Sequence, residues 1–414
     1  MTSLPNANGP MLDEAQAVDK YIWRSPYAKQ IWIVWFLLLG LGLIGMYQRV
    51  TMGHMPAGYG SYVPWGLWIA IYFHGVGIAG GAFVVGAMGY ILGARGLGTA
   101  SMLRTVIVLS IAAMVPSFMA VWLDLGRLDR AHRIMTSPNF TSMMAFNSWM
   151  YMAFIGVAVV TWVLSFRPRS TWLKPFLVLG IFLACLIPSQ SGAFFGVVDA
   201  RPFWHSALFP VLFLASAITS GAAMLMFVRA ALGPQAFRWA SMDSQAEHDE
   251  ALNRLRIVVA CGLSIYLVLE FAEFSIAIWS PASHSPAIEM ILWGPYWWAF
   301  WIVHLLIGAI VPLVLFFFTH RRGIWAVGAL LVAITMLTTR LNVLIPGQSV
   351  PELKGLQEAF HHPRLNYTYH ATAMEYLVGL FLIALGMATY VIARRIGATI
   401  AVRLDKETNG NKKK

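Results

Sequence analysis

The chain has 414 residues, of which 58% are hydrophobic and 11% are charged, and its mean hydropathy is +0.66. A soluble domain carries about 25% charged residues, so this composition excludes an ordinary soluble protein and indicates a polytopic membrane protein. The net charge of +11 does not require a nucleic-acid partner, because membrane topology accounts for it. The two cysteines, Cys185 and Cys261, lie in apolar runs and fit neither a metal-binding spacing nor a disulfide framework.

Ten segments are apolar enough over the roughly 20 residues that a helix needs to cross a bilayer. The sequence therefore predicts an all-α fold in which one membrane domain, residues 30–395, is flanked by segments 1–29 and 396–414. The lysine-rich tail, 396–414, is expected to be disordered. The predicted spans are 30–48, 66–92, 103–123, 142–166, 172–195, 207–229, 255–279, 296–318, 323–345 and 371–393.

Lysine and arginine are divided unequally between the two sides of this topology. With both termini on one side, that side holds 21 of the 29 residues and the opposite side holds eight. The positive-inside rule then predicts that both terminal segments are cytoplasmic. The opposite, outer side carries a long loop, 346–370, rich in proline and histidine; it is either a partner-binding loop or simply a solvated one.

A charged segment, residues 122–133, follows the third span and contains two acids, three arginines and a histidine. Such a cluster at the mouth of a membrane helix either anchors the helix or builds a site. Asp124 precedes Arg127 by three residues, so a continued helix would pair them on one face. Asp124 is also expected to lie beside His74, where it could donate and accept protons near the outer surface.

His74 lies about two turns inside the second span, on an otherwise apolar helix. An ionisable residue at this depth is a functional candidate. The alternative is a histidine whose ring is hydrogen-bonded to a neighbouring carbonyl group.

The seventh span places Tyr266, Glu270 and Glu273 on one helical face, because they are spaced by four and three residues. Two carboxyl groups in hydrocarbon need partners or protons. A proton path is the functional interpretation, and a satisfied polar core is the alternative. The candidate partners are His304, Arg340, Glu375 and Tyr376.

Two histidines, His74 and His304, lie well inside spans, and no spacing pairs them as axial haem ligands. The sequence contains no nucleotide-binding loop, metalloprotease motif or nucleophile elbow. We therefore expect neither haem nor metal in this chain.

Three blocks of sequence carry a family resemblance: 64–66 with 77–83, then Leu-Asp-Leu-Gly-Arg-Leu-Asp-Arg at 123–130, then 143–149. On these blocks the chain resembles the integral membrane subunits of the NrfD/polysulfide reductase C family, from about residue 64 to 393. Its ten spans are similar to the longer branch of that family, which includes hydrogenase membrane subunits, alternative complex III and the menaquinone reductase complex. The last of these is the one that it resembles most.

The resemblance implies two four-helix bundles, 66–195 and 207–345, with the first and tenth spans outside them. It also implies menaquinone bound near the outer face of a bacterial inner membrane, and no cofactor held by the chain itself. The implied partners are a periplasmic iron–sulfur subunit, a molybdopterin-family-like subunit and a multihaem cytochrome c. In the polysulfide reductase relative an Asn and a His form part of the quinone site; here Ile69 and Tyr72 occupy those places, with His74 displaced toward the glycine block.

Two functions from different classes follow. The first is a quinone-binding subunit that reduces menaquinone, with His74 and Asp124 as proton donors; it is inactive alone. The second is a proton-coupled secondary transporter, which would have a midplane site and no partners. In the first, the quinone site comprises Tyr72, His74, Asp124, Arg127 and Arg130, and the proton path comprises Tyr266, Glu270, Glu273, His304, Arg340 and Glu375.

Overall fold

The computed structural model describes residues 28–167, 170–233, 245–279, 285–353, 355–362 and 364–411. The predicted N-terminal segment 1–29 lies outside this part of the chain, apart from its last two residues.

Within the described residues, ten helices are long and apolar enough to cross a membrane, which confirms the predicted fold class. They are α2 (Ala28–Met52), α3 (Leu67–Ile91), α4 (Ala100–Asp124), α6 (Met143–Ser165), α7 (Leu173–Gly196), α8 (Phe209–Leu232), α9 (Gln245–Trp279), η3 with α11 (Ala299–Ile310 and Val311–Phe318), α12 with α13 (Arg322–Thr335 and Leu337–Ser349) and α15 (Ala373–Asn411). The short helices η1 (Leu128–Arg130), α5 (Arg133–Thr136), α10 (Ser285–Leu292) and α14 (Leu356–Ala359) lie between them.

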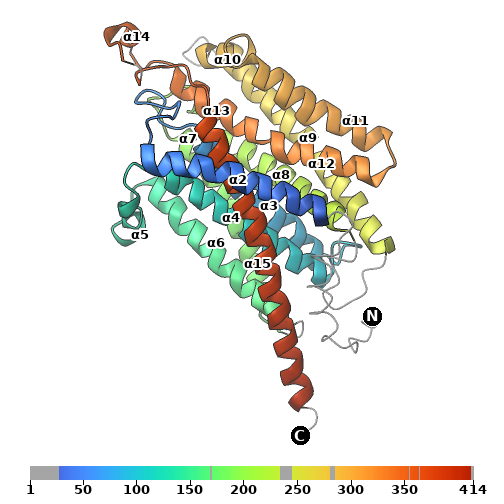
Figure 1. The fold of residues 1–414 in the computed structure, drawn as a ribbon. Helices are drawn as coiled ribbons and strands as arrows, with labels where there is room; N and C mark the ends of the chain where they lie inside the picture. Colours follow the sequence, from blue (N-terminus) through green and yellow to red (C-terminus); the bar gives the residue numbers. More distant parts are fainter. Residues whose placement is uncertain are drawn as a thin grey trace.

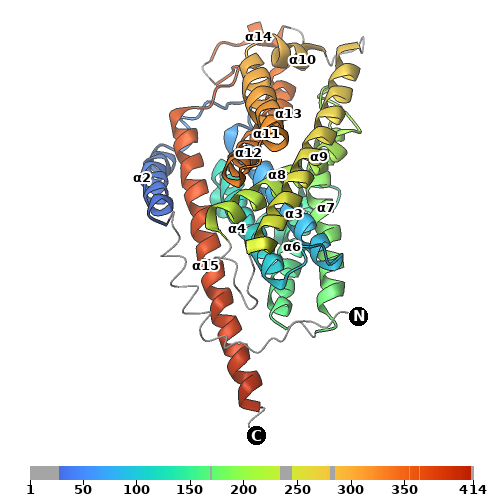
Figure 2. The same cartoon turned by 90° about the vertical axis from the view of Figure 1, so that its right-hand side faces the viewer.

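The helices pack as two groups that meet along α3 and α8 (Figures 1 and 2). In the first group α3 packs against α4 and α7, and α6 packs against α7 and α4. In the second group α8 packs against α9 and α12, and α11 packs against α12. The α3–α8 contact needs glycine, because a Cβ atom on Gly81 would overlap the carbonyl oxygen of Ala217. Small residues let membrane helices approach this closely.

Helices α2 and α15 pair outside the two groups, and α15 also packs against α4 (Figure 2). Glycines set the distance between them. A Cβ atom on Gly42 would lie 2.6 Å from the backbone of Phe381, and one on Gly45 would lie 2.6 Å from Cβ of Leu377. The rest of α2 is largely exposed, as expected for a lipid-facing helix.

The C-terminal segment corrects the prediction of a disordered tail as far as Asn411, and residues 412–414 lie outside the described part of the chain. Helix α15 continues from the tenth span as far as Asn411 and projects beyond the rest of the molecule (Figure 1). The segment after residue 393 contains no proline and several good helix formers, so the helix that starts in the membrane can propagate past its end.

Candidate functional site

Most of the predicted site residues fall into two polar clusters, one buried and one partly buried. The core cluster, in the second group of helices, comprises Tyr266, Glu270, Glu273, His304 and Arg340. The rim cluster lies at the end of the molecule that carries the loops 53–66, 125–142 and 350–372. It comprises Arg49, His54, Tyr59, Asp124 and Glu375.

A hydrogen-bonded chain joins α9 to η3 in the core cluster. The Tyr266 hydroxyl donates to Oε1 of Glu270 at 2.7 Å, and Oε2 of Glu270 lies 2.8 Å from Nε2 of His304. All three side chains are buried. Both carboxylate oxygens of Glu270 therefore have a partner, as buried polar groups require.

The other two members of the core cluster face a small cavity. Oε2 of Glu273 accepts a hydrogen bond of 2.8 Å from Oγ of Ser206. Arg340 donates from Nη2 to the carbonyl oxygen of Phe213 at 3.2 Å, and its guanidinium carbon lies 3.9 Å from the centre of the Phe213 ring. The cavity, lined in part by Glu270, Glu273 and Arg340, has a volume of about 20 Å³. That volume has room for one water molecule between two carboxyl groups and a guanidinium.

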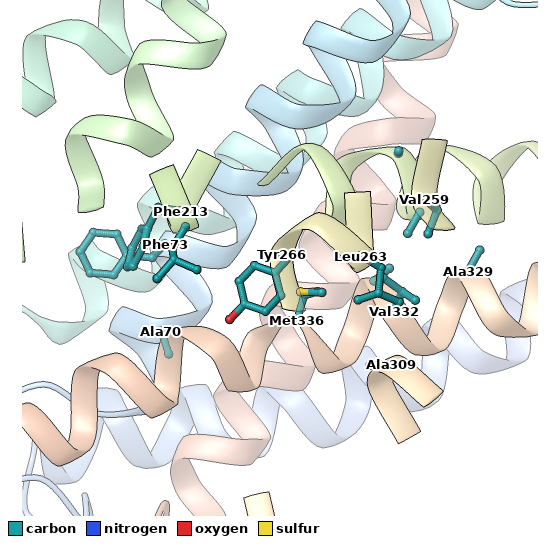
Figure 3. Packing of buried hydrophobic residues seen from close by; sticks show 14 of the residues in the cluster. Ala70, Phe73, Phe213, Val259, Leu263, Tyr266, Ala309, Ala329, Val332 and Met336 are labelled. Atoms are coloured by element: carbon teal, nitrogen blue, oxygen red, sulfur yellow. The ribbon is translucent and has the colours of Figure 1, made fainter. Parts of the chain in front are cut away.

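Apolar side chains enclose Tyr266. Its ring lies between Phe73 and Phe213 on one side and Met336 and Leu263 on the other (Figure 3). Charges in such surroundings are weakly screened, which strengthens the interactions within the core cluster.

An unusual helix carries His304. The segment η3 (Ala299–Ile310) is a π-helix, a rare form that is frequently found at functional sites. In this register His304 faces Glu270.

His74 lies near the core cluster and makes no contact with Asp124, contrary to the expectation that the two are neighbours. Its Nε2 donates to the carbonyl oxygen of Ala333 in α12 at 2.8 Å. One turn further along α3, a Cβ atom on Gly77 would lie 3.3 Å from Nη2 of Arg340. His74 thus faces the second group of helices. Its carbonyl bond is the alternative that the sequence left open.

Arg49 and His54 form one side of the rim cluster. Arg49 is buried, and it donates from Nε to the carbonyl of Leu123 at 2.9 Å and from Nη2 to that of Leu125 at 3.2 Å. These two residues flank Asp124. Nη2 of Arg49 also lies 2.9 Å from Nε2 of His54. Burial, and then the charge of Arg49, lower the pKa of His54.

Tyr59 lies between His54 and the start of α3. Its hydroxyl is 2.6 Å from Nδ1 of His54, and its ring packs edge-on to Trp68 at 5.9 Å between centroids. Burial, followed by the charges of Asp124 and Glu375, raises the pKa of Tyr59. The hydroxyl of Tyr59 therefore stays protonated at physiological pH.

Glu375 belongs to the rim cluster and not to the core cluster, which corrects its place on the predicted proton path. It is fully buried at the third position of α15, and its Oε2 accepts from the backbone N–H of Thr372 at 3.0 Å, as in a capping box. Oε2 also accepts from the N–H of Gly58 at 2.9 Å and from the hydroxyl of Thr372 at 3.2 Å. Oε1 accepts a 2.5 Å hydrogen bond from Tyr369. These donors satisfy both oxygens.

Tyr369 ties the long loop 350–372 to the start of α3. Its hydroxyl accepts a 2.7 Å hydrogen bond from the N–H of Leu67 while it donates to Glu375. Burial, and then Glu375, raise its pKa. The loop is therefore held across the rim by a buried tyrosine.

Asp124 is the unsatisfied member of the rim cluster. Its Oδ1 is buried and has no hydrogen-bond partner among the described residues. The expected pair with Arg127 does not form, because α4 ends at Asp124 and Arg127 turns to Asp129, with 3.0 Å between Nη2 and Oδ2. Arg127 holds the pKa of Asp129 below its usual value. Arg130, with Nε 4.0 Å from Asp129, is also exposed.

Tyr72 lies in the first group of helices and belongs to neither cluster. Its ring meets that of Tyr151 edge-on at 5.9 Å between centroids, and the hydroxyl of Tyr151 lies 2.9 Å from Oγ of Ser191. Tyr72 packs against the apolar side chains around Trp68 and Leu123 beside the rim cluster, but it makes no hydrogen bond to Asp124 in the described part of the chain.

Sequence reasoning missed four residues of the rim: Arg49, His54, Tyr59 and Tyr369. The first three follow the first span within eleven positions, and Tyr369 comes three residues before the N-cap of the last. A signal was present, because polar and aromatic residues at the ends of adjacent spans must satisfy each other where the loops are short.

Comparisons with known proteins agree with this fold. Residues 57–352 match the family described as "Polysulphide reductase, NrfD". The C subunit of selenate reductase from Mesobacillus selenatarsenatis is 25% identical over 85% of this chain and 90% of its own length. The Hdr-like menaquinol oxidoreductase integral membrane subunit from Archaeoglobus fulgidus is 25% identical over 90% of this chain and 94% of its own. Protein NrfD from Escherichia coli is 27% identical over 69% of this chain and 95% of its own length.

The family match covers more than two thirds of the chain and both polar clusters except for Arg49, His54 and Glu375. The ten apolar helices are those of a multi-pass integral membrane protein. The chain belongs to the polysulphide reductase NrfD family.

Proposed function

We propose that this chain is the quinone-binding membrane subunit of a respiratory oxidoreductase complex and that the complex reduces menaquinone. The observation that carries this proposal is the alignment, over 90% of this chain and 94% of the relative, with a protein named as an Hdr-like menaquinol oxidoreductase integral membrane subunit. Quinone chemistry consumes or releases two protons for each two electrons. The chain must therefore place proton-exchanging groups beside the quinone.

The rim cluster is the part of the predicted site that best suits this task. Oδ1 of Asp124 is buried and unsatisfied among the described residues, so a hydrogen-bonding group of a substrate has a place there. Trp68, Met374 and Leu123 supply apolar walls nearby. Asp124 is the proposed general acid that delivers a proton to a quinone oxygen.

The remaining predicted site residues take secondary roles in this proposal. Nε2 of His74 donates its proton to the carbonyl oxygen of Ala333. Any proton that His74 delivers to the quinone must therefore come from Nδ1. Exposed Arg127 and Arg130 would meet a partner or a lipid headgroup at the rim. Tyr72 would contact the quinone only deeper inside the first group of helices.

The core cluster is proposed to move protons through the second group of helices. Tyr266, Glu270 and His304 form a continuous hydrogen-bonded chain, and Glu273 is separated from Glu270 by one helical turn and a water-sized cavity. If proton movement along this hydrogen-bonded chain is coupled to quinone reduction, turnover is electrogenic.

The partners and orientation follow the family pattern. We place the rim in the periplasm and both termini in the cytoplasm of a bacterial inner membrane, with 1–29 and 396–414 as cytoplasmic segments. An iron–sulfur subunit would dock on the rim loops and receive electrons through multihaem cytochrome c and molybdopterin-family-like subunits. The menaquinone reductase branch is the proposed place of the chain within its family.

Purification of the native complex through a tag on this chain tests the proposal. Iron and haem are assayed in the copurified proteins, and reduction of a soluble naphthoquinone by a reduced viologen dye is followed. We expect iron together with naphthoquinone reduction. A chain that purifies alone, contains no iron and moves a polar solute across a vesicle membrane would contradict the proposal and favour the transporter.

A further inference from the structure

The hydrogen bonds from Arg49 through His54 to Tyr59 share one donor-to-acceptor direction, and Arg49 sets it. Nε2 of His54 lies 2.9 Å from Nη2 of Arg49 and 3.4 Å from the carbonyl oxygen of Leu125. An arginine side chain can only donate, so the shorter contact makes Nε2 the acceptor. The nearby positive charge and the lowered pKa of His54 both favour a neutral ring. The ring proton of His54 therefore lies on Nδ1.

The same logic fixes the Tyr59 hydroxyl. Nδ1 of His54 donates to the oxygen of Tyr59 across 2.6 Å. The proton of Tyr59 must then point away from His54. It makes no direct hydrogen bond to another described residue.

Two carboxyl groups lie near Tyr59, and one of them is already satisfied. Glu375 accepts four hydrogen bonds from Gly58, Tyr369 and Thr372. Asp124 has a buried Oδ1 without a partner in the described chain. Arg49 binds the carbonyls on both sides of Asp124, which holds the carboxyl group in the same cluster as Tyr59. A free donor and a free acceptor therefore lie in one partly buried cluster.

We propose that Arg49 and His54 are positioning residues that aim the hydroxyl of Tyr59 at Asp124 through one bridging water molecule. This inference rests on the proposed function of Asp124 as a general acid. A hydrogen bond donated through that water favours the charged form of a carboxyl group. It would stabilise Asp124 after the loss of its proton, and the proton of Tyr59 would stay on Tyr59 throughout. The hydrogen bonds from Arg49 to Tyr59 thus make Asp124 a stronger acid, and none of these residues gives up a proton.

Infrared difference spectroscopy of the tagged complex, recorded between acidic and neutral pH, tests the hydrogen bond without turnover. The band of the Asp124 carboxyl group is identified by its loss in Asp124→Asn. We expect Tyr59→Phe, which removes only the hydroxyl, to shift that band to higher frequency. Tyr47→Phe is the matched control, because Tyr47 is an exposed residue of α2. An unchanged Asp124 band in Tyr59→Phe would overturn the proposal.

His54 is tested with two variants in the same complex. In His54→Asn an amide N–H replaces Nδ1–H as the donor to Tyr59, whereas His54→Ala removes the donor. We expect His54→Ala to broaden and shift the Asp124 band, and His54→Asn to restore most of its position. The same band in His54→Ala as in the unaltered complex would exclude His54 as a positioning residue.

Turnover separates this inference from the proposed function. We expect Tyr59→Phe to lower kcat for naphthoquinone reduction about tenfold or more, the size of a hydrogen bond to a charged group, with little change in KM. An unaltered complex that does not react with naphthoquinone would overturn the proposed function while the infrared result still stood. An active complex in which Tyr59→Phe keeps full kcat would overturn the inference alone.

Discussion

The core cluster and the rim cluster contain the same kinds of side chain but differ in how completely their carboxyl oxygens are hydrogen-bonded. The closed part of the core cluster is the chain Tyr266–Glu270–His304, since Nε of Arg340 is buried without a partner among the described residues. In the core cluster both oxygens of Glu270 are bonded, to Tyr266 and His304. At the rim Glu375 is equally well satisfied, but Oδ1 of Asp124, in the described part of the chain, has no partner. A closed network stabilises the fold or carries protons within itself. An open one leaves a place for a substrate.

The strongest way to break this comparison is to remove the open carboxyl group. Asp124→Asn keeps the shape of the side chain and removes its acidity. We expect naphthoquinone reduction by the intact complex to fall by about 10²–10⁴, the contribution typical of a general acid. Native gel electrophoresis would show the complex still assembled. Activity within a factor of two of the unaltered complex would remove Asp124 from the chemistry.

Breaking the closed network should instead affect stability. Glu270→Ala leaves Tyr266 and His304 buried without their shared partner, and removal of one member of a buried pair costs about 3–5 kcal/mol. Thermal unfolding in detergent should therefore begin at a clearly lower temperature, whereas Asp124→Asn should leave it nearly unchanged. The reverse order of the two unfolding temperatures would show that the clusters have been wrongly assigned as closed and open.

A packing change in α2, one helical turn before Arg49, should sharpen the contrast, because the rim cluster depends on α2 and the core cluster does not. A Cβ atom on Gly45 would lie 2.6 Å from Cβ of Leu377, so Gly45→Ala must shift α2 or α15 at a cost of about 1–3 kcal/mol. The expected result is a lower unfolding temperature and reduced naphthoquinone reduction. Gly40→Ala is the control, since no atom would lie within 4 Å of its Cβ. Equal effects of the two substitutions would exclude the close helix contact.

The smallest expected effect is the pH dependence of the rim. The groups around His54 are Arg49, Arg364, Tyr59 and the carbonyl of Leu125. Burial, followed by the charges of Arg49 and Arg364, lowers its pKa from 6.5, and the hydrogen bond to Leu125 opposes them. The folded state therefore prefers the neutral ring. The contribution of His54 to stability is complete above pH 6.5 and is lost as the pH falls through the lowered value. Unfolding temperatures measured from about pH 7.5 to about 4.5 should fall less steeply in His54→Asn than in the unaltered chain; identical slopes would contradict this.

Much of the fold could be predicted from the sequence, because a bilayer demands long apolar helices and the residues that break them are easy to see. The placement of Tyr266, Glu270 and Glu273 on one face was also predictable, since the spacing lies within one helix. His304 as the partner of Glu270 was one of several candidates. The structure selected it.

The division of residues between clusters could not be predicted. His74 and Glu375 each belong near the cluster opposite to the expected one. The depth of a residue in the membrane follows from its position in a span, but its direction depends on how neighbouring helices are rotated. The predicted pair of Asp124 and Arg127 was wrong for a local reason. Helix α4 ends at Asp124, so the two residues do not share a helical face.

The glycine contact between α2 and α15 has a wider consequence for how this protein can vary. Arg49 reaches Asp124's neighbours from the end of a helix that touches mainly lipid and α15. The bilayer's thickness and lateral pressure act directly on such a helix. Membrane composition could thereby tune the acid strength at the rim without altering a single side chain there.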